Sequence, residues 1–233
     1  MCGIIGNWKF NGEHIDLNEF KIMKEKLIHR GPDESGVFIE NNLALGHQRL
    51  SIIDLDTGRQ PISNKTGKIW ITYNGEVYNF GELRSILKKK GYEFRTNTDT
   101  EVVVNLYEEY GNEFVNMLCG MFAFAIWDSR KKIMILARDR MGQKPLYYYY
   151  DEKQLIFASE LKAIIKKKNI KKEVDPNGLN DYLYLGYIPS PLTIYKNIKK
   201  LAPGNIAVIT ESELKINRYW KPIVGNEIKL DSK

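Results

Sequence analysis

Cys2 brings together two groups that acyl-transfer chemistry needs. It follows the initiator methionine, so removal of Met1 would leave a cysteine at the N-terminus. Its thiol is a nucleophile, and its free α-amino group, with an unperturbed pKa of about 7.7–8, would be a base attached to the same residue. The simpler interpretation is that a cysteine stands at position 2 by accident. Gly3 and Gly6 favour the functional interpretation, because they let a substrate or another strand approach closely.

The segment YNGEVYN could supply the other half of an acyl-transfer site. The side-chain amide of Asn74 and the backbone N–H of Gly75 are the two donors that an oxyanion hole requires, although Asn-Gly after a strand is also typical of a plain turn. Glu76 and Asp99 could hold an ammonium group, and helix capping alone would also explain Asp99. Arg49 lies among apolar residues, where it would be half-exposed or would pair with a carboxylate of the protein or of a substrate.

Other kinds of site find little support. The sequence has neither GxxxxGK[ST] nor GxGxxG, the two common phosphate-binding loops. Its three histidines and two cysteines have no ligand-like spacing, so no metal site is expected. Cys119, between a helix and an apolar strand, is expected to be a small buried thiol rather than a catalytic one.

Composition narrows the class of protein further. The chain has 233 residues, 43% of them hydrophobic, which is enough for a sizeable core. No apolar run approaches the length of a membrane span, and no signal peptide is recognised, so we expect a cytoplasmic protein without disulfides. The net charge of +6 could indicate an acidic partner. Most basic residues are lysines, however, and where they cluster, at 88–90 and 166–168, they close helical segments, so nucleic-acid binding is not expected.

Short segments punctuated by Gly, Pro and Asn dominate the chain and predict an α+β fold. Apolar or alternating patterns predict strands at 4–8, 35–40, 43–47, 68–74, 121–128, 132–138, 146–150, 154–159 and 205–210. Helices are predicted at 18–28, 81–90, 112–118, 160–168 and 176–185, and a further helix opens with the capping box at 98–101. Strands in antiparallel runs, with helices between the runs, favour a layered sandwich over a doubly wound parallel sheet.

Nine segments, in order, resemble the class II glutamine amidotransferase domain of glutamine-hydrolysing asparagine synthetases. They are MCGIIG, RGPDESG, GHQRLSIIDL, YNGEVYN, TDTEV, GMFAFAIWD, ARDRMGQKPLYY, FASELKAI and LGYIPSP…KLAPG. The resemblance implies the N-terminal nucleophile hydrolase fold, an αββα sandwich of two mainly antiparallel sheets between helical layers. It also implies hydrolysis of the glutamine side-chain amide to glutamate and ammonia through a thioester.

The resemblance assigns a role to each candidate site residue. Cys2 would be the nucleophile, with its own α-amino group as base, and Asn74 and Gly75 would form the oxyanion hole. Arg49 would bind the α-carboxylate of glutamine. Glu76 and Asp99 would hold its α-amino group. Backbone groups of Leu50, Ile52 and Ile53 would line the same pocket.

The same resemblance predicts how the chain is divided and what it works with. Residues 1–220 would form the amidotransferase domain, and residues 221–233 a linker or tail toward a synthetase domain. No SGG-x-DS loop occurs in these 233 residues. The glutaminase half-reaction would need no cofactor, and ATP and magnesium would be used only in the synthetase domain or subunit that receives the ammonia. L-Glutamine is the expected substrate, no membrane or nucleic-acid partner is expected, and a homodimer is left open.

Two alternatives stay open from the sequence. The same glutaminase could serve another acceptor, such as a sugar phosphate or a different carboxylate. The chain could also be a non-catalytic interaction module that kept the fold. The second alternative is disfavoured by the joint presence of all six candidate residues: Cys2, Arg49, Asn74, Gly75, Glu76 and Asp99.

Overall fold

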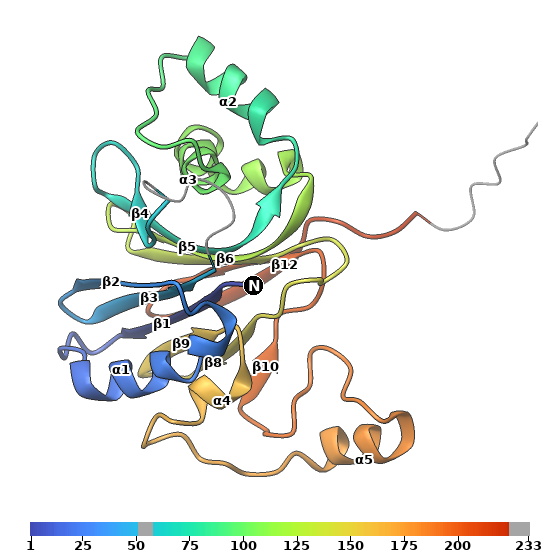
Figure 1. The fold of residues 1–233 in the computed structure, drawn as a ribbon. Helices are drawn as coiled ribbons and strands as arrows, with labels where there is room; N and C mark the ends of the chain where they lie inside the picture. Colours follow the sequence, from blue (N-terminus) through green and yellow to red (C-terminus); the bar gives the residue numbers. More distant parts are fainter. Residues whose placement is uncertain (51–57, 224–233) are drawn as a thin grey trace, which may run out of the picture.

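Two six-stranded sheets packed face to face form the centre of the protein (Figure 1). The computed structural model describes residues 1–50 and 58–223. Every strand pair within the two sheets is antiparallel. This is the arrangement that the short, turn-punctuated segments predict.

The first sheet, sheet A, has the strand order β10-β8-β9-β1-β3-β2, and the second, sheet B, has the order β12-β11-β7-β6-β5-β4. The strands of sheet A are β1 (Gly3–Lys9), β2 (Glu34–Glu40), β3 (Leu43–Arg49), β8 (Tyr147–Tyr150), β9 (Gln154–Ala158) and β10 (Ile198–Lys200). Those of sheet B are β4 (Ile62–Ser63), β5 (Ile69–Val77), β6 (Gly120–Asp128), β7 (Ile133–Arg138), β11 (Asn205–Ile209) and β12 (Leu214–Arg218).

Helices cover the outer faces of both sheets, so the protein has four layers. In Figure 1, α2 and α3 lie above sheet B, while α1 and α4 lie below sheet A. The α-helices are α1 (Leu17–Glu25), α2 (Phe80–Lys89), α3 (Asp99–Tyr110), α4 (Leu161–Ile164) and α5 (Pro176–Leu185), with 3-10 helices at Ile28–Arg30 and Gly111–Met117. Three apolar clusters fill the spaces between the layers. The central strands β6 and β7 are therefore buried on both faces, as the apolar residues in their sequences indicate.

Several predicted boundaries change in the structure. Strand β5 continues to Val77, three residues beyond the predicted end, because β6 pairs with it along its whole length. The helices predicted at 18–28 and 160–168 are shorter, and the one predicted at 112–118 is a 3-10 helix. The prediction for Cys119 is wrong, since this cysteine is exposed. Local pattern could not show these ends, because pairing with distant strands decides them.

The predicted tail is described only in part. Residues 221–223 are exposed and have no regular structure, and 224–233 lie outside the described residues. Within 1–50 and 58–223, no helix is both long and apolar enough to cross a membrane.

Two side-chain hydrogen bonds tie the sheets together between β3 and β5. The Nε2 of His47 lies 3.0 Å from the carbonyl oxygen of Tyr73, and the Thr72 hydroxyl donates to the carbonyl oxygen of Gly46 at 3.1 Å. Burial lowers the pKa of His47 to about 4, so at neutral pH the ring is uncharged and its Nε2–H donates. Its Nδ1 has no partner among the described residues, which leaves a second ring proton without an acceptor.

The titration of His47 predicts how stability depends on pH. An unfolded histidine binds its proton near pH 6.5, whereas the folded one resists it down to about pH 4. The unfolded state therefore binds more protons in this window, and the free energy of unfolding should fall as pH drops from about 6.5 to about 4, by on the order of 3 kcal/mol.

Urea titrations at a series of pH values measure this slope. His47→Gln keeps an N–H donor for Tyr73 but cannot take up a proton, so it should lose this part of the slope. His14→Gln, at an exposed histidine, is the matched control and should keep it. An unchanged slope in His47→Gln would show that other groups cause the acid instability.

Candidate active site

The cavity that collects the predicted groups lies at the N-terminal end of β1. Strand β1 pairs with β3 on one side and β9 on the other, so the residue just before it is held in place. The Nε of Arg30 donates to the carbonyl oxygen of Cys2 at 2.9 Å, and an ion pair with Glu160 at 3.0 Å orients that guanidinium. The structure brings together seven predicted residues: Cys2, Arg49, Leu50, Asn74, Gly75, Glu76 and Asp99.

The Cys2 thiol is partly buried and contacts the backbone of Leu50. Leu50 N–H donates to Sγ at 3.4 Å, and Sγ lies 3.6 Å from the Leu50 carbonyl oxygen. Burial raises the pKa of the thiol, and the Leu50 N–H and the nearby chain N-terminus only partly oppose this. The thiol therefore stays protonated at neutral pH, and attack by sulfur requires a base close to it.

Asn74 and Gly75 lie on β5 where one edge of the strand is open to the cavity. The N–H groups of Tyr73 and Val77 point away from β6, since they donate to Gln60 Oε1 at 2.7 Å and to Asp99 Oδ2 at 2.9 Å. Backbone groups of alternate residues in an antiparallel strand point to the same edge. The N–H of Gly75, midway between these two residues, consequently points toward the cavity.

Only glycine fits at position 75. A Cβ there would lie 2.3 Å from the carbonyl oxygen of Met121 and 2.7 Å from the Cα of Phe122, both on β6. The Asn-Gly pair is therefore not a turn. It is part of a strand whose backbone approaches its neighbour too closely for a side chain.

The side-chain amide of Asn74 is buried without a hydrogen-bond acceptor. The residue is 1% exposed, and its Nδ2 has no partner in the described part of the chain. An unpaired buried N–H group costs free energy. A donor kept in this state beside a thiol is typical of a site that binds an oxygen atom from outside the protein.

Two carboxyl groups line the opposite part of the cavity. Asp99 begins α3, and its Oδ2 accepts hydrogen bonds from the Tyr73 hydroxyl at 2.8 Å and from the Val77 N–H at 2.9 Å. Burial raises the pKa of Asp99 in spite of these donors. Burial and repulsion from Asp99 likewise raise the pKa of Glu76. A bound cation would relieve this repulsion, so this part of the cavity suits an ammonium group.

Arg49 lies at the end of β3 and is buried. Its Nη1 forms an ion pair with Glu34 at 3.0 Å, and Glu34 also pairs with the exposed Arg59 at 2.7 Å. Of the two environments predicted for Arg49, the structure therefore has the one in which it pairs with a carboxylate of the protein. This pair fixes the direction of the guanidinium at the cavity wall.

Sequence reasoning missed Lys144, a third kind of charged group in the cavity. Lys144 is 7% exposed and lines the cavity, and none of the described residues forms an ion pair with its ammonium. The loop that carries it is folded around buried Asp139, which accepts from the backbone N–H groups of Met141, Gln143 and Lys144 at 2.9–3.1 Å. Lys144 belongs to the segment ARDRMGQKPLYY, but nothing in the local sequence predicts that its side chain turns inward.

Gln60 and Tyr73 were also missed as supports of the site. Gln60 accepts from the Tyr73 N–H and donates to the Thr100 hydroxyl at 3.3 Å, and so joins β5 to the first turn of α3. Tyr73 in turn holds Asp99. The predicted pocket residues Ile52 and Ile53 lie outside the described residues, so their contribution stays a prediction.

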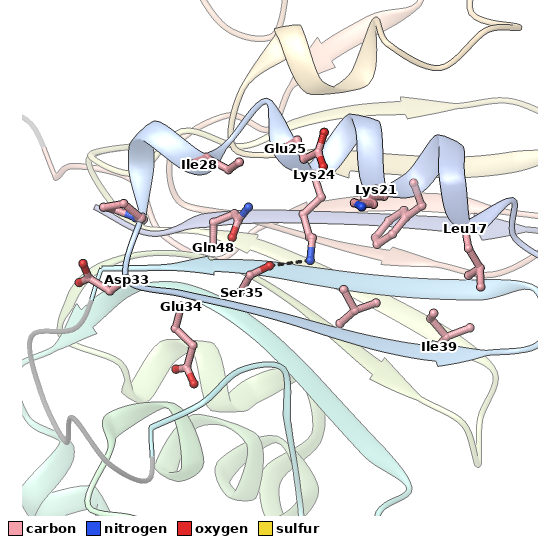
Figure 2. Close-up of a pocket in the computed structure, with 14 residues that line it drawn as sticks. Leu17, Lys21, Lys24, Glu25, Ile28, Asp33, Glu34, Ser35, Ile39 and Gln48 are labelled. Atoms are coloured by element: carbon pink, nitrogen blue, oxygen red, sulfur yellow. Dashed lines mark hydrogen bonds between the residues drawn. The ribbon is translucent and has the colours of Figure 1, made fainter.

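A larger cavity, of about 570 Å³, lies on the outer face of sheet A between α1, β2 and β3 (Figure 2). Apolar side chains such as Leu17, Ile28 and Ile39 line it, and Lys24 donates to the Ser35 hydroxyl at 2.6 Å. The described residues that line it include no cysteine or histidine. We therefore place the chemistry in the smaller cavity at Cys2.

Comparison with known proteins identifies the family of this chain. A family model described as the glutamine amidotransferase domain matches residues 1–220, and the chain belongs to this family. Asparagine synthetase [glutamine-hydrolyzing] 1 of Bacillus subtilis is 38% identical over 99% of this chain and 38% of its own length. Asparagine synthetase B [glutamine-hydrolyzing] of Escherichia coli is 42% identical over 71% of this chain and 30% of its own length.

Solved structures confirm the predicted fold class. The glutamine phosphoribosylpyrophosphate amidotransferase of Bacillus subtilis superposes with a TM-score of 0.67 at 22% identity, over 95% of this chain and 50% of that one. The resemblance to the amidotransferase domain of glutamine-hydrolysing asparagine synthetases is confirmed as well. The chain spans less than half the length of these synthetases, so more than half of each lies outside the match.

Lys144 should control the ionisation of Glu76. The ammonium of Lys144 lowers the pKa of Glu76, against the effects of burial and Asp99. Lys144→Met should therefore raise that pKa further, as measured by carbon-13 NMR titration of the glutamate carboxyl groups. Lys144→Arg keeps the positive charge and is the matched control. An unchanged Glu76 pKa in Lys144→Met would mean that the ammonium does not act on this carboxylate.

Proposed function

We propose that this chain hydrolyses the side-chain amide of glutamine and supplies the ammonia to an ATP-dependent asparagine synthetase. The observation that carries the proposal is the unpartnered, buried amide of Asn74 in the same cavity as the Cys2 thiol. The names of the relatives support glutamine as the nitrogen source and the synthesis of asparagine as its use. ATP and magnesium would act in the synthetase part, and the glutaminase step would need no cofactor.

The zwitterionic backbone of glutamine matches the charges of the cavity. Arg49 would bind the α-carboxylate, while Glu76 and Asp99 would hold the α-ammonium group. Backbone groups from Leu50 onward, including those of Ile52 and Ile53, would complete the pocket. Held in this way, the side-chain amide of glutamine would extend toward the Cys2 sulfur.

Once Met1 has been removed, the α-amino group of Cys2 becomes the base that the protonated thiol needs. It takes the thiol proton as sulfur attacks the amide carbon, and the carbonyl oxygen becomes an oxyanion between Asn74 Nδ2–H and Gly75 N–H. The carbon–nitrogen bond then breaks, and nitrogen leaves as ammonia with the proton held by the amine. Water hydrolyses the thioester, which releases glutamate and restores the thiol. We expect this in the cytoplasm, where both cysteines stay reduced.

The nucleophile is tested by intact mass before and after incubation with 6-diazo-5-oxo-norleucine, an electrophilic glutamine analogue. The purified chain should lack Met1 and gain one adduct, which peptide mapping should place at Cys2. Cys2→Ser should not react, whereas Cys119→Ser should react like the wild type because Cys119 is not among the residues that line the cavity at Cys2. Retention of Met1, or an adduct at Cys119, would contradict the mechanism.

The oxyanion role of Asn74 is tested by steady-state glutamate release. Asn74→Ala should lower kcat by about 10²–10³-fold, the typical effect of losing one oxyanion donor, with a much smaller change in KM. Arg49→Lys should instead mainly raise KM, because it weakens ground-state and transition-state binding alike. An Asn74→Ala enzyme with normal kcat and raised KM would show that this amide only binds substrate.

A further inference from the structure

Helix α5 exposes large apolar side chains around most of its surface. We name Leu179, Tyr182, Leu183, Tyr184, Leu185 and Tyr187, on the helix and the turn after it, the α5 patch. Leu183 is 77% exposed and Tyr184 is 86% exposed. Asp181 is the single charged residue of this helix. The C-terminal half of the helix, from Tyr182 to Leu185, is apolar and exposed. Exposed apolar patches of this kind mark interaction sites.

The patch is held rigidly. Asp175 caps the start of α5 by accepting from the Asn177 N–H at 3.0 Å, and the N–H of Gly186 closes its end on the Tyr182 carbonyl at 2.9 Å. Gly178 packs against the backbone of Thr193, so closely that a Cβ would lie 2.4 Å from that carbonyl oxygen. The helix is thus anchored through its N-terminal part, and α5 lies away from both sheets (Figure 1).

The segment that carries the patch is joined to the wall of the active site. After α5 the chain forms β10, which pairs with β8, the strand that follows Lys144. Arg138 holds both ends of this connection, because its Nε donates to the Lys144 carbonyl at 2.7 Å and its Nη1 donates to the Leu201 carbonyl at 2.8 Å. A partner bound to the patch would therefore contact a segment that is connected, through β10, β8 and Arg138, to the loop that carries Lys144.

We propose that the α5 patch is the docking surface for the synthetase module that receives the ammonia, an inference that rests on the proposed function. More than half of each synthetase relative lies outside the match with this chain, so these relatives carry a large further part. Among the described helices, α5 exposes the most large apolar side chains. Ammonia released into neutral water becomes protonated and loses its nucleophilic electron pair. The acceptor must therefore stay attached, and a tyrosine-rich surface with little charge suits a lasting contact.

Binding to a synthetase module tests the docking surface. The probe is the part of Bacillus subtilis asparagine synthetase 1 outside the match, first checked for ATP-dependent asparagine formation from ammonium. Biolayer interferometry then measures its Kd for three forms of the full 233-residue chain. They are the wild type, Leu183→Gln/Tyr184→Gln on α5, and the matched control Ile22→Gln/Ile86→Gln, at exposed isoleucines of α1 and α2.

The wild type and the control should bind the module alike, and the α5 variant at least tenfold more weakly. Absence of wild-type binding to the active module, or equal binding by the α5 variant, would overturn the proposal. The proposal would also be overturned if the wild type sediments as a dimer and the α5 variant as a monomer, because a second copy of the chain would then cover the patch.

Labelling of Cys2 by 6-diazo-5-oxo-norleucine separates this proposal from the glutaminase itself. All three forms should label equally, since the α5 substitutions are at exposed positions outside the catalytic cavity. If Cys2 is not labelled but the synthetase module binds normally, the proposed chemistry is refuted and the docking surface is still supported. Normal labelling without docking would refute only the surface.

Discussion

The groups proposed for catalysis come from both sheets, so the candidate site depends on how the sheets are held against each other. Cys2, Arg49 and Leu50 belong to the β1–β3 side, and Asn74 and Gly75 to β5. The hydrogen bonds from His47 to Tyr73 and from Thr72 to Gly46 cross the interface next to these residues. Apolar packing alone would allow the sheets to slide by small amounts, whereas directional hydrogen bonds set their relative position. An oxyanion hole requires this precision, because its donors act over a narrow range of distance.

Several features of the cavity lower the stability of the folded protein and are the ones that a bound ligand would satisfy. Asn74 keeps a buried donor unpaired, burial raises the pKa of both Glu76 and Asp99, and Lys144 is buried without an ion-pair partner among the described residues. Each group is less favourable here than in water. An amino acid that carries both charges and an amide oxygen could satisfy the two carboxylates, the cation and the donor together. The rest of the core, with its closely packed apolar clusters, offsets the cost.

The sequence pattern predicted the larger elements well and their ends poorly. The hairpin of β6 and β7 and the helix at 176–185 appear as predicted, because alternating apolar residues and Asp-Pro at a helix start are strong local signals. The end of β5 depends on pairing with β6, and the helix predicted at 160–168 shrinks to four residues beside β9. Such ends are decided by distant partners that no window of sequence contains.

By itself the sequence indicated the candidate nucleophile, the candidate oxyanion pair and the order of the motifs, since those depend on residue type and on position along the chain. Tertiary structure alone decided which edge of β5 is open, that Arg49 pairs with Glu34, and that Lys144 turns into the cavity. It also decided that Cys119 is exposed and that the apolar helix α5 stands outside the core. The physical reason is that burial and side-chain direction follow from contacts between segments far apart in the chain, whereas chemical identity is local.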